Sequence, residues 1–186
     1  MTPSITSISI YDLITRCRKD DGRAQMEVYN RYYKAMYNTS LRIVGDTTEA
    51  EDIMQEAFLK AFSKIDSFKG TSSFGAWLKR IVINLSISAY HKKMKLNEVT
   101  YRDELNSETS NNWSLLSEED SEEDKVKKVL QGLNSLKENY RVALSLHLIE
   151  GYDYEELGAI LNLSYGNCRT TISRAKEKLR KIVLEK

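Results

Sequence analysis

The chain has 186 residues, of which 30% are charged and 41% apolar, with a formal net charge of +1, and this balance excludes an intrinsically disordered chain. The 8 glycines and the single proline are too few for the turns of a β-sandwich, and two cysteines exclude a disulfide framework or a paired-cysteine zinc site. We expect an all-α protein with no secretory signal, no metal or cofactor, and no direct membrane insertion.

The N-terminal half shows the apolar spacing of four helices. They are expected at about 9–20, at 23–44 with Gly45 as the stop, after a Thr48-x-x-Glu51 capping box, and at about 74–93. The third helix carries an apolar stripe with the i, i+3, i+4 spacing of a buried face, namely Ala50, Ile53, Met54, Ala57, Phe58, Ala61, Phe62 and Ile65. A turn at residues 66–73, which contains Gly70, leads to the fourth helix.

An acidic segment divides the chain. Residues 98–124 contain ten acidic residues and one basic residue, whereas residues 1–97 and 125–186 each carry a net charge of +5. The segment is polar and poor in apolar residues, which is the composition of a linker. We therefore predict two small helical domains, at residues 1–95 and 121–186, joined by a flexible acidic linker at residues 96–120.

The C-terminal part is predicted to form four further helices, at about 121–133, 137–149, 154–161 and 165–184. An Asp153-x-x-Glu156 capping box begins the third of them, and Ser164 is expected to cap the last. A short helix, a three-residue turn and a long basic helix have the spacing of a helix-turn-helix. Cys168 falls on the inner face of the last helix, where packing is its expected role.

The outer side of this last helix is basic and rich in hydroxyl groups. Its side chains are Arg169, Thr170, Ser173, Arg174 and Lys176. Such groups suit phosphate contacts and hydrogen bonds to base edges in the major groove. A helical hairpin with a solvated basic face is the plainer alternative.

The polar side of the third helix forms a second group, made of Glu51, Asp52, Gln55 and Glu56. Their i, i+4 spacing places several hydrogen-bond acceptors on one surface. Such a surface is usually a solvated helix face. It can also perform acid–base or metal chemistry, or dock a basic protein partner, and no histidine accompanies it.

A third group mixes aromatic and basic residues between residues 68 and 95, a combination that can stack on and neutralise unpaired bases. The turn at residues 69–73 stands at a helix start, where free backbone N–H groups attract anions, so we interpret it as a nucleic-acid contact. We assign Trp77 to the core.

In this order, the three groups resemble those of a known family. The segment Ala50-Glu-Asp-Ile-Met-Gln-Glu-Ala-Phe58 resembles the polymerase-binding helix of sigma factors, and Trp77-Leu-Lys-Arg-Ile-Val-Ile-Asn84, followed by Lys92 and Lys93, resembles their promoter-melting helix. Residues 151–161 and 164–176 resemble their C-terminal helix-turn-helix. Two domains without a third between them are similar to the layout of the extracytoplasmic-function (ECF) group of the sigma-seventy family, over about residues 24–95 and 126–182.

The resemblance implies a cytoplasmic promoter-specificity subunit that is not an enzyme and has no catalytic residue. Its implied partners are bacterial RNA polymerase core, promoter DNA and an anti-sigma factor. The implied polymerase-binding residues are Glu51, Asp52, Gln55 and Glu56. The implied −10 contacts are Phe68, Lys69, Ser72, Ser73, Lys79, Arg80 and Asn84. The implied −35 contacts are Ser164, Tyr165, Asn167, Arg169, Thr170, Ser173, Arg174 and Lys176, and the acidic linker is implied to enter the RNA path.

Two other functional classes remain open from the residues. A free-standing helix-turn-helix regulator would account for the C-terminal part, but not for the acidic helix face or the aromatic and basic segment. A helical enzyme would use the carboxylates between Glu51 and Glu56, although the chain lacks a glycine-rich phosphate loop and a nucleophile–base pair.

Overall fold

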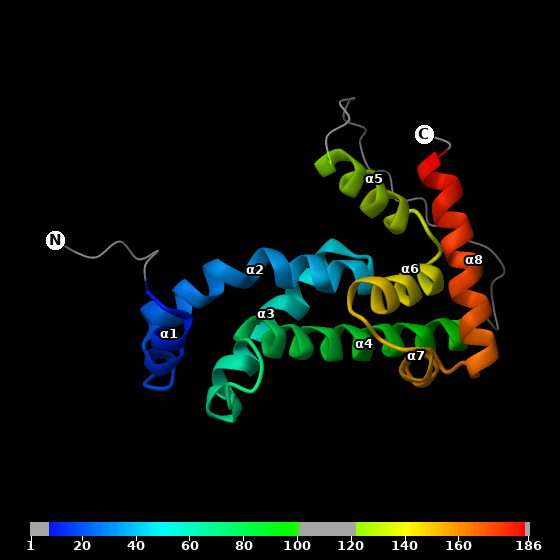
Figure 1. Ribbon diagram of the computed structural model, residues 1–186. Helices are drawn as coiled ribbons and strands as arrows, with labels where there is room; N and C mark the ends of the chain where they lie inside the picture. Colours follow the sequence, from blue (N-terminus) through cyan, green and yellow to red (C-terminus); the bar gives the residue numbers. More distant parts are fainter. Residues whose placement is uncertain (1–7, 101–121, 185–186) are drawn as a thin grey trace. The chain divides into compact units, whose positions relative to one another are not determined.

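The computed structural model describes residues 8–100 and 122–184 and divides into two compact units, Met1–His91 and Lys92–Lys186 (Figure 1). The helices assigned before the gap are α1 (Ile10–Cys17), α2 (Gly22–Val44), α3 (Thr47–Ser63), the 3-10 helix η2 (Ile65–Ser67) and α4 (Phe74–Thr100). After the gap they are α5 (Glu122–Asn134), α6 (Glu138–Leu144), the π-helix η3 (Ser145–Ile149), α7 (Tyr154–Leu161) and α8 (Tyr165–Leu184). The described residues contain helices and no strands, which confirms the all-α prediction.

The division between the units falls within α4, which ends at Thr100 rather than near residue 93 as predicted. Residues 96–100 of the predicted linker therefore belong to a helix. Residues 101–120, and with them most of the linker prediction, lie outside the described residues. In the part of the chain that is described, no helix has the length and apolar character needed to cross a bilayer.

Local sequence explains where the helices of the first unit begin and end. Gly45 stops α2 as predicted, with a left-handed φ of 78° that a glycine adopts without strain. The predicted capping box at Thr48 is wrong, because Asp46 caps α3 instead. Its carboxylate accepts a hydrogen bond from the Glu49 amide at 2.8 Å, and its backbone is extended, as is typical of a residue that caps a helix N-terminus.

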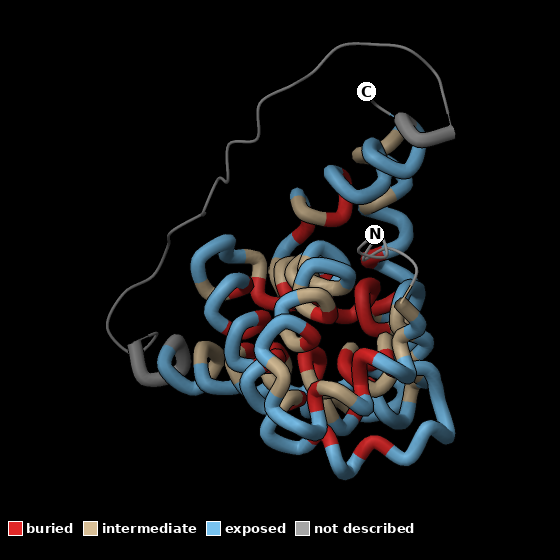
Figure 2. Tube along the Cα trace, turned by 90° about the vertical axis from the view of Figure 1, so that its left-hand side faces the viewer, coloured by how far each residue is buried: buried red, intermediate tan, exposed pale blue. Residues whose placement is uncertain are grey.

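The core of the first unit lies among α1, α2, α3 and α4, whose inward faces are buried (Figure 2). The predicted stripe on α3 is buried from Ala50 to Ala61, and Phe62 is half-buried at its edge. Among the hydrophobic residues of α2 and α4, Val28, Ile43, Leu78 and Val82 are fully buried. The hydroxyl oxygens of Ser40 and Ser86 lie 3.1 Å apart in this core, so two small polar residues satisfy each other where α2 meets α4.

The second unit packs α5, α6 and α7 against α8. Its most deeply buried residues include Val142, Leu144, Leu146, Leu157, Cys168, Ile172 and Ala175. The single helix predicted at 137–149 is wrong in detail, since α6 ends at Leu144 and a π-helical turn follows. In that turn the Glu150 amide donates to the Ser145 carbonyl, five residues back, at 3.1 Å.

Candidate nucleic-acid interface

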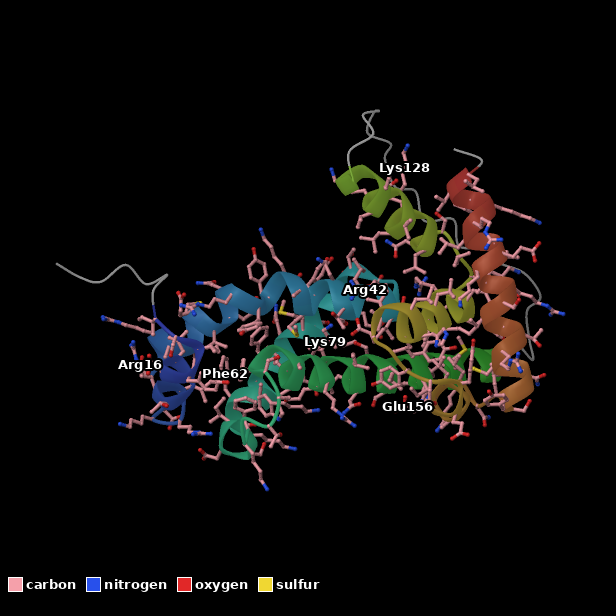
Figure 3. All side chains as sticks on the ribbon, viewed as in Figure 1. Arg16, Arg42, Phe62, Lys79, Lys128 and Glu156 are labelled. Carbon is pink, nitrogen blue, oxygen red and sulfur yellow. The ribbon has the colours of Figure 1, made fainter. Side chains whose placement is uncertain are left out.

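Capping residues determine where the two helices of the helix-turn-helix begin and where the first of them ends. Asp153 and Glu156 form the predicted capping box at the start of α7, where Glu156 is labelled in Figure 3. Asn162 ends α7 in the left-handed conformation, with φ 54°, which asparagine tolerates better than most residues. The Ser164 hydroxyl then accepts from the Asn167 amide at 3.3 Å and caps α8, as predicted. The two helices therefore have the predicted bounds.

The second helix of this motif turns one face inward and leaves the other in solvent. Cys168, Ile172 and Ala175 are buried, which confirms the prediction that Cys168 packs in the core. Burial also raises the pKa of the Cys168 thiol. All eight residues predicted to contact the −35 element are exposed, namely Ser164, Tyr165, Asn167, Arg169, Thr170, Ser173, Arg174 and Lys176. The structure therefore brings these side chains to one solvent-facing end and side of α8.

The basic groups of this face are available for a partner. Within residues 8–100 and 122–184, no carboxylate forms an ion pair with Arg169, Arg174 or Lys176. Further along α8, Lys181 pairs with Glu177 at 3.3 Å, and the Lys178 ammonium lies 5.4 Å from the centre of the Tyr140 ring. Positive charge is thus uncommitted toward the N-terminal half of α8, which is where a recognition helix contacts base edges.

Two aromatic rings in series, those of His147 and Tyr154, support Tyr165 at the start of α8, and no pattern in the sequence predicted this arrangement. The His147 and Tyr154 ring centres lie 4.8 Å apart, and Tyr154 in turn meets Tyr165 edge-on at 5.8 Å. The His147 ring is fixed by a 2.8 Å hydrogen bond between Nδ1 and the Tyr152 carbonyl. The exposed side chain of Tyr165 is therefore packed against Tyr154. This contact reduces the conformational entropy that the side chain would lose when a partner binds.

The acidic face of α3 lies opposite the buried stripe. Glu51, Asp52, Gln55 and Glu56 are all exposed. The Gln55 amide donates to Glu51 at 3.4 Å, and Glu56 pairs with Lys60 at 2.7 Å. Among the described residues, no three His, Cys, Asp or Glu side chains gather as ligands for a metal ion. The four residues form one continuous polar surface along two turns of helix.

In the loop at residues 68–73, one predicted DNA contact, Phe68, is buried. Phe68 is only 4% exposed, and its ring packs against Phe74 and Trp77 at centre distances of 5.5 and 5.4 Å. Phe68 is therefore a core residue, and we remove it from the DNA-contacting set. The reason is that it closes the aromatic cluster at the start of α4, where the sequence alone did not show which aromatic residues turn inward.

The rest of the loop is exposed and held at its far end. Lys69, Ser72 and Ser73 are in solvent, and Gly70 takes a φ of 72° that favours glycine. The Ser73 hydroxyl accepts from the Ala76 amide at 3.2 Å and so caps α4.

On α4 itself, two of the predicted DNA contacts share a face. Arg80 and Asn84 are exposed at i, i+4 spacing. Lys79, labelled in Figure 3, is half-buried and lies further round the helix. Of the residues predicted to contact the −10 element, the exposed ones are therefore Lys69, Ser72, Ser73, Arg80 and Asn84.

A contact with Arg18, which the sequence did not predict, fixes the start of this loop. A nitrogen of the Arg18 guanidinium donates to the Phe68 carbonyl at 2.9 Å, across 50 positions of sequence. No local pattern could have revealed it, because Arg18 follows a helix that no motif in the sequence singled out.

Comparison with known proteins agrees with both units. The family description Sigma-70 region 2 matches residues 28–95, and Sigma-70, region 4 matches residues 127–179. The chain is 33% identical over 175 residues to the ECF RNA polymerase sigma factor SigW of Bacillus subtilis (strain 168), covering 90% of this chain and 93% of SigW. It is 30% identical over 173 residues to the ECF RNA polymerase sigma-E factor of Escherichia coli (strain K12), covering 90% of each.

A solved structure shares the fold. The sigma factor RpoE from Bartonella quintana, determined in complex with the anti-sigma factor NepR, aligns with a TM-score of 0.51 at 23% identity, over 85% of this chain and 95% of that one. The family matches run through both units in the same order, and the two ECF sigma factors align with this chain over at least 90% of their lengths. This chain belongs to the sigma-70 family and to its ECF group.

Proposed function

We propose that this chain is a dissociable promoter-specificity subunit of bacterial RNA polymerase that acts in the cytoplasm through binding rather than through catalysis of its own. One observation carries the proposal: a region 2 and a region 4 lie in one chain, and each presents an exposed polar face suited to a different partner. A free-standing regulator would need the second face but not the first.

The second unit is proposed to read the −35 element as duplex DNA. Arg169 and Arg174 supply charged donors, and Asn167, Thr170 and Ser173 supply shorter hydrogen-bonding groups on the same exposed helix. Arginine pairs well with guanine, and asparagine with adenine, at the floor of the major groove. The lysine on this face, Lys176, is better suited to phosphate, which positions the helix without reading sequence.

The first unit is proposed to hold the −10 element once its strands separate. The exposed loop after Phe68 offers backbone amides and hydroxyl groups, and Arg80 and Asn84 lie on the helix that follows. Unstacking a base costs a few kcal/mol, and a site that binds the extruded base offsets part of that cost. Binding of the unpaired strand by this loop would therefore favour melting.

The polymerase is proposed to bind the α3 face made of Glu51, Asp52, Gln55 and Glu56. All four are exposed, and three are carboxylates, so the complementary surface on the polymerase would be basic. An anti-sigma factor is proposed as a further partner, because RpoE of Bartonella quintana was solved with NepR and the same class of inhibitor would block either DNA-binding unit here.

Run-off transcription tests the proposed function directly. Purified core polymerase, this chain and a library of random promoters should yield initiation at one shared two-part sequence, and none without the chain. A cognate core that initiates with a control sigma factor but not with this chain would overturn the proposal. Specific duplex binding by the chain without core would then favour a free-standing regulator.

A further inference from the structure

We propose that Arg18 is a positioning residue for promoter melting, which holds the loop at residues 68–73 in the conformation that receives an unpaired base. This inference rests on the function proposed above for that loop. Arg18 directly follows α1, which lies before the matched residues 28–95 and belongs to none of the binding surfaces proposed above.

Helix α1 gives Arg18 a rigid base. Leu13, Ile14 and Cys17 anchor the helix in the core, each at most 3% exposed. In the last turn of the helix, Arg16 binds the carboxylate of Asp21 at 2.8 Å and thereby fixes the turn into α2. The Arg18 amide itself donates to the Ile14 carbonyl at 3.0 Å, so the backbone that carries the guanidinium has little freedom.

The guanidinium reaches the start of the loop at two points. One terminal nitrogen donates to the Phe68 carbonyl at 2.9 Å, and Nε lies 3.6 Å from a carboxylate oxygen of Asp66 in η2. The Asp66 side chain is 86% exposed, so water screens that ion pair and it adds little. The bond to the carbonyl is the substantial one, because a charged donor binds a carbonyl more strongly than a neutral one does.

The orientation of the Phe68 carbonyl determines the direction in which the loop leaves the core. The Phe68 carbonyl and the Lys69 N–H belong to the same planar peptide group and point in opposite directions. Arg18 therefore fixes the direction of the first N–H of the exposed stretch as well as the carbonyl. The Phe68 ring is held in the aromatic cluster and Ser73 caps α4, so both ends of the loop are anchored before DNA arrives.

Such anchoring lowers the cost of binding. A loop that must first become ordered spends part of its binding free energy on that ordering, and one held in the bound conformation does not. The geometry therefore assigns to Arg18 an effect on capture of the −10 strand, and no direct effect on the −35 duplex or on the polymerase.

The test uses holoenzyme and a single-stranded oligonucleotide that carries the −10 sequence of the promoter recovered from the library. Arg18→Met removes the donors and keeps most of the apolar stem, which limits damage to folding. We expect its affinity for the oligonucleotide to fall about tenfold, and Arg18→Lys, which keeps one donor for the carbonyl, to recover most of the loss. Lys19→Met is the matched control, because it removes the same charge from the adjacent position, and it should bind normally.

Two further readouts separate positioning from a general loss of structure. In Arg18→Met, amide hydrogen exchange should accelerate at residues 69–73, while the unfolding midpoint, core affinity and −35 duplex affinity stay at wild-type values. Equal affinity of wild type and Arg18→Met overturns the inference, as does an equal loss in Lys19→Met or a loss that follows a lowered unfolding midpoint. If wild-type holoenzyme itself fails to bind the −10 strand, the proposed function of the loop fails first, and that result is distinct.

Discussion

The Leu163 amide donates to the Gly158 carbonyl at 2.9 Å, and this bond closes the turn between α7 and α8. The two residues approach so closely that a Cβ atom on Gly158 would lie 2.8 Å from the Leu163 carbonyl oxygen. Glycine in the middle of a helix costs stability relative to alanine, so its presence here has a packing reason. It allows the backbone after α7 to fold back on the helix.

This contact predicts a strong effect for a small substitution. Gly158→Ala should lower the free energy of unfolding of the second unit by about 1–3 kcal/mol, because the atom it meets is backbone and cannot move without opening the turn. Urea unfolding of the full chain measures the change. Gly166→Ala is the control: nothing lies within 4 Å of its Cβ position, so stability should stay the same or rise slightly. Equal losses in the two variants would show that the close approach is unimportant.

Removal of either arginine from the exposed face of α8 should weaken promoter binding in a sequence-dependent way. We expect Arg169→Ala and Arg174→Ala each to lower the affinity of the holoenzyme by about 1–3 kcal/mol at a promoter with the preferred −35 sequence. At a promoter with a scrambled −35 sequence, the loss should be smaller.

Competition binding at fixed salt concentration measures both affinities. Lys178→Ala is the matched control on the same helix, since Lys178 is directed to the Tyr140 ring and not to the proposed DNA face. A loss for Lys178→Ala as large as that for the arginines, or equal losses on both promoters, would contradict direct reading of the −35 element.

Charge reversal on α3 should prevent assembly without unfolding the unit. Asp52→Lys combined with Glu56→Lys is expected to raise the dissociation constant for core polymerase at least tenfold, since like charges then face each other across the interface. Stability should change little, because an exposed i, i+4 pair such as Glu56 with Lys60 contributes about 0.3–0.5 kcal/mol.

The control for this variant is Glu177→Lys, which breaks a still more exposed i, i+4 pair with Lys181 on α8. It should leave core affinity unchanged. Fluorescence anisotropy of the labelled chain with increasing core polymerase gives both constants, and core binding by the double variant at wild-type strength would exclude the α3 face as the docking site.

The cap of α2 predicts a dependence of stability on pH. The hydrogen bond from Arg16, followed by that from the Ala24 amide, holds the pKa of the Asp21 carboxyl group below its usual range. A carboxyl group with a lower pKa in the folded state stabilises the fold above its unfolded pKa, and this stabilisation is lost as the pH falls through the folded pKa. Asp21→Asn should therefore melt at a lower temperature than wild type at pH 7, and the difference in melting temperature should narrow as the pH falls below the ordinary pKa of an aspartic acid side chain.

Thermal unfolding from pH 7 down to about pH 3 follows this difference through the titration range of a carboxyl group. Arg16→Met should reproduce the same pattern, because it removes the largest cause of the lowered pKa. A difference between wild type and Asp21→Asn that is constant with pH would contradict the assignment.

Several features of the fold were predictable because their signals are local. The bounds of α7 and α8 follow from Asp153, Asn162 and Ser164, whose side chains and conformations act within four residues. Where two local signals competed, the prediction was wrong: Thr48 and Asp46 can both cap a helix, and in the structure Asp46 does so. The π-helical turn after Leu144 lies in an apolar stretch that has no sequence pattern to distinguish it from an α-helix. A single straight helix was therefore predicted there.

The sequence by itself determined the helices, their apolar faces and the order of the groups that resemble a sigma factor, because each depends on spacing within one or two turns of a helix. Only the tertiary structure decided that Phe68 is buried, that Arg18 holds its carbonyl, and that Tyr165 rests on Tyr154. Arg18 and Phe68 are 50 positions apart, and spacing along the chain carries no information on such a pair. They meet because α1 and the start of α4 bury their apolar faces in the same core.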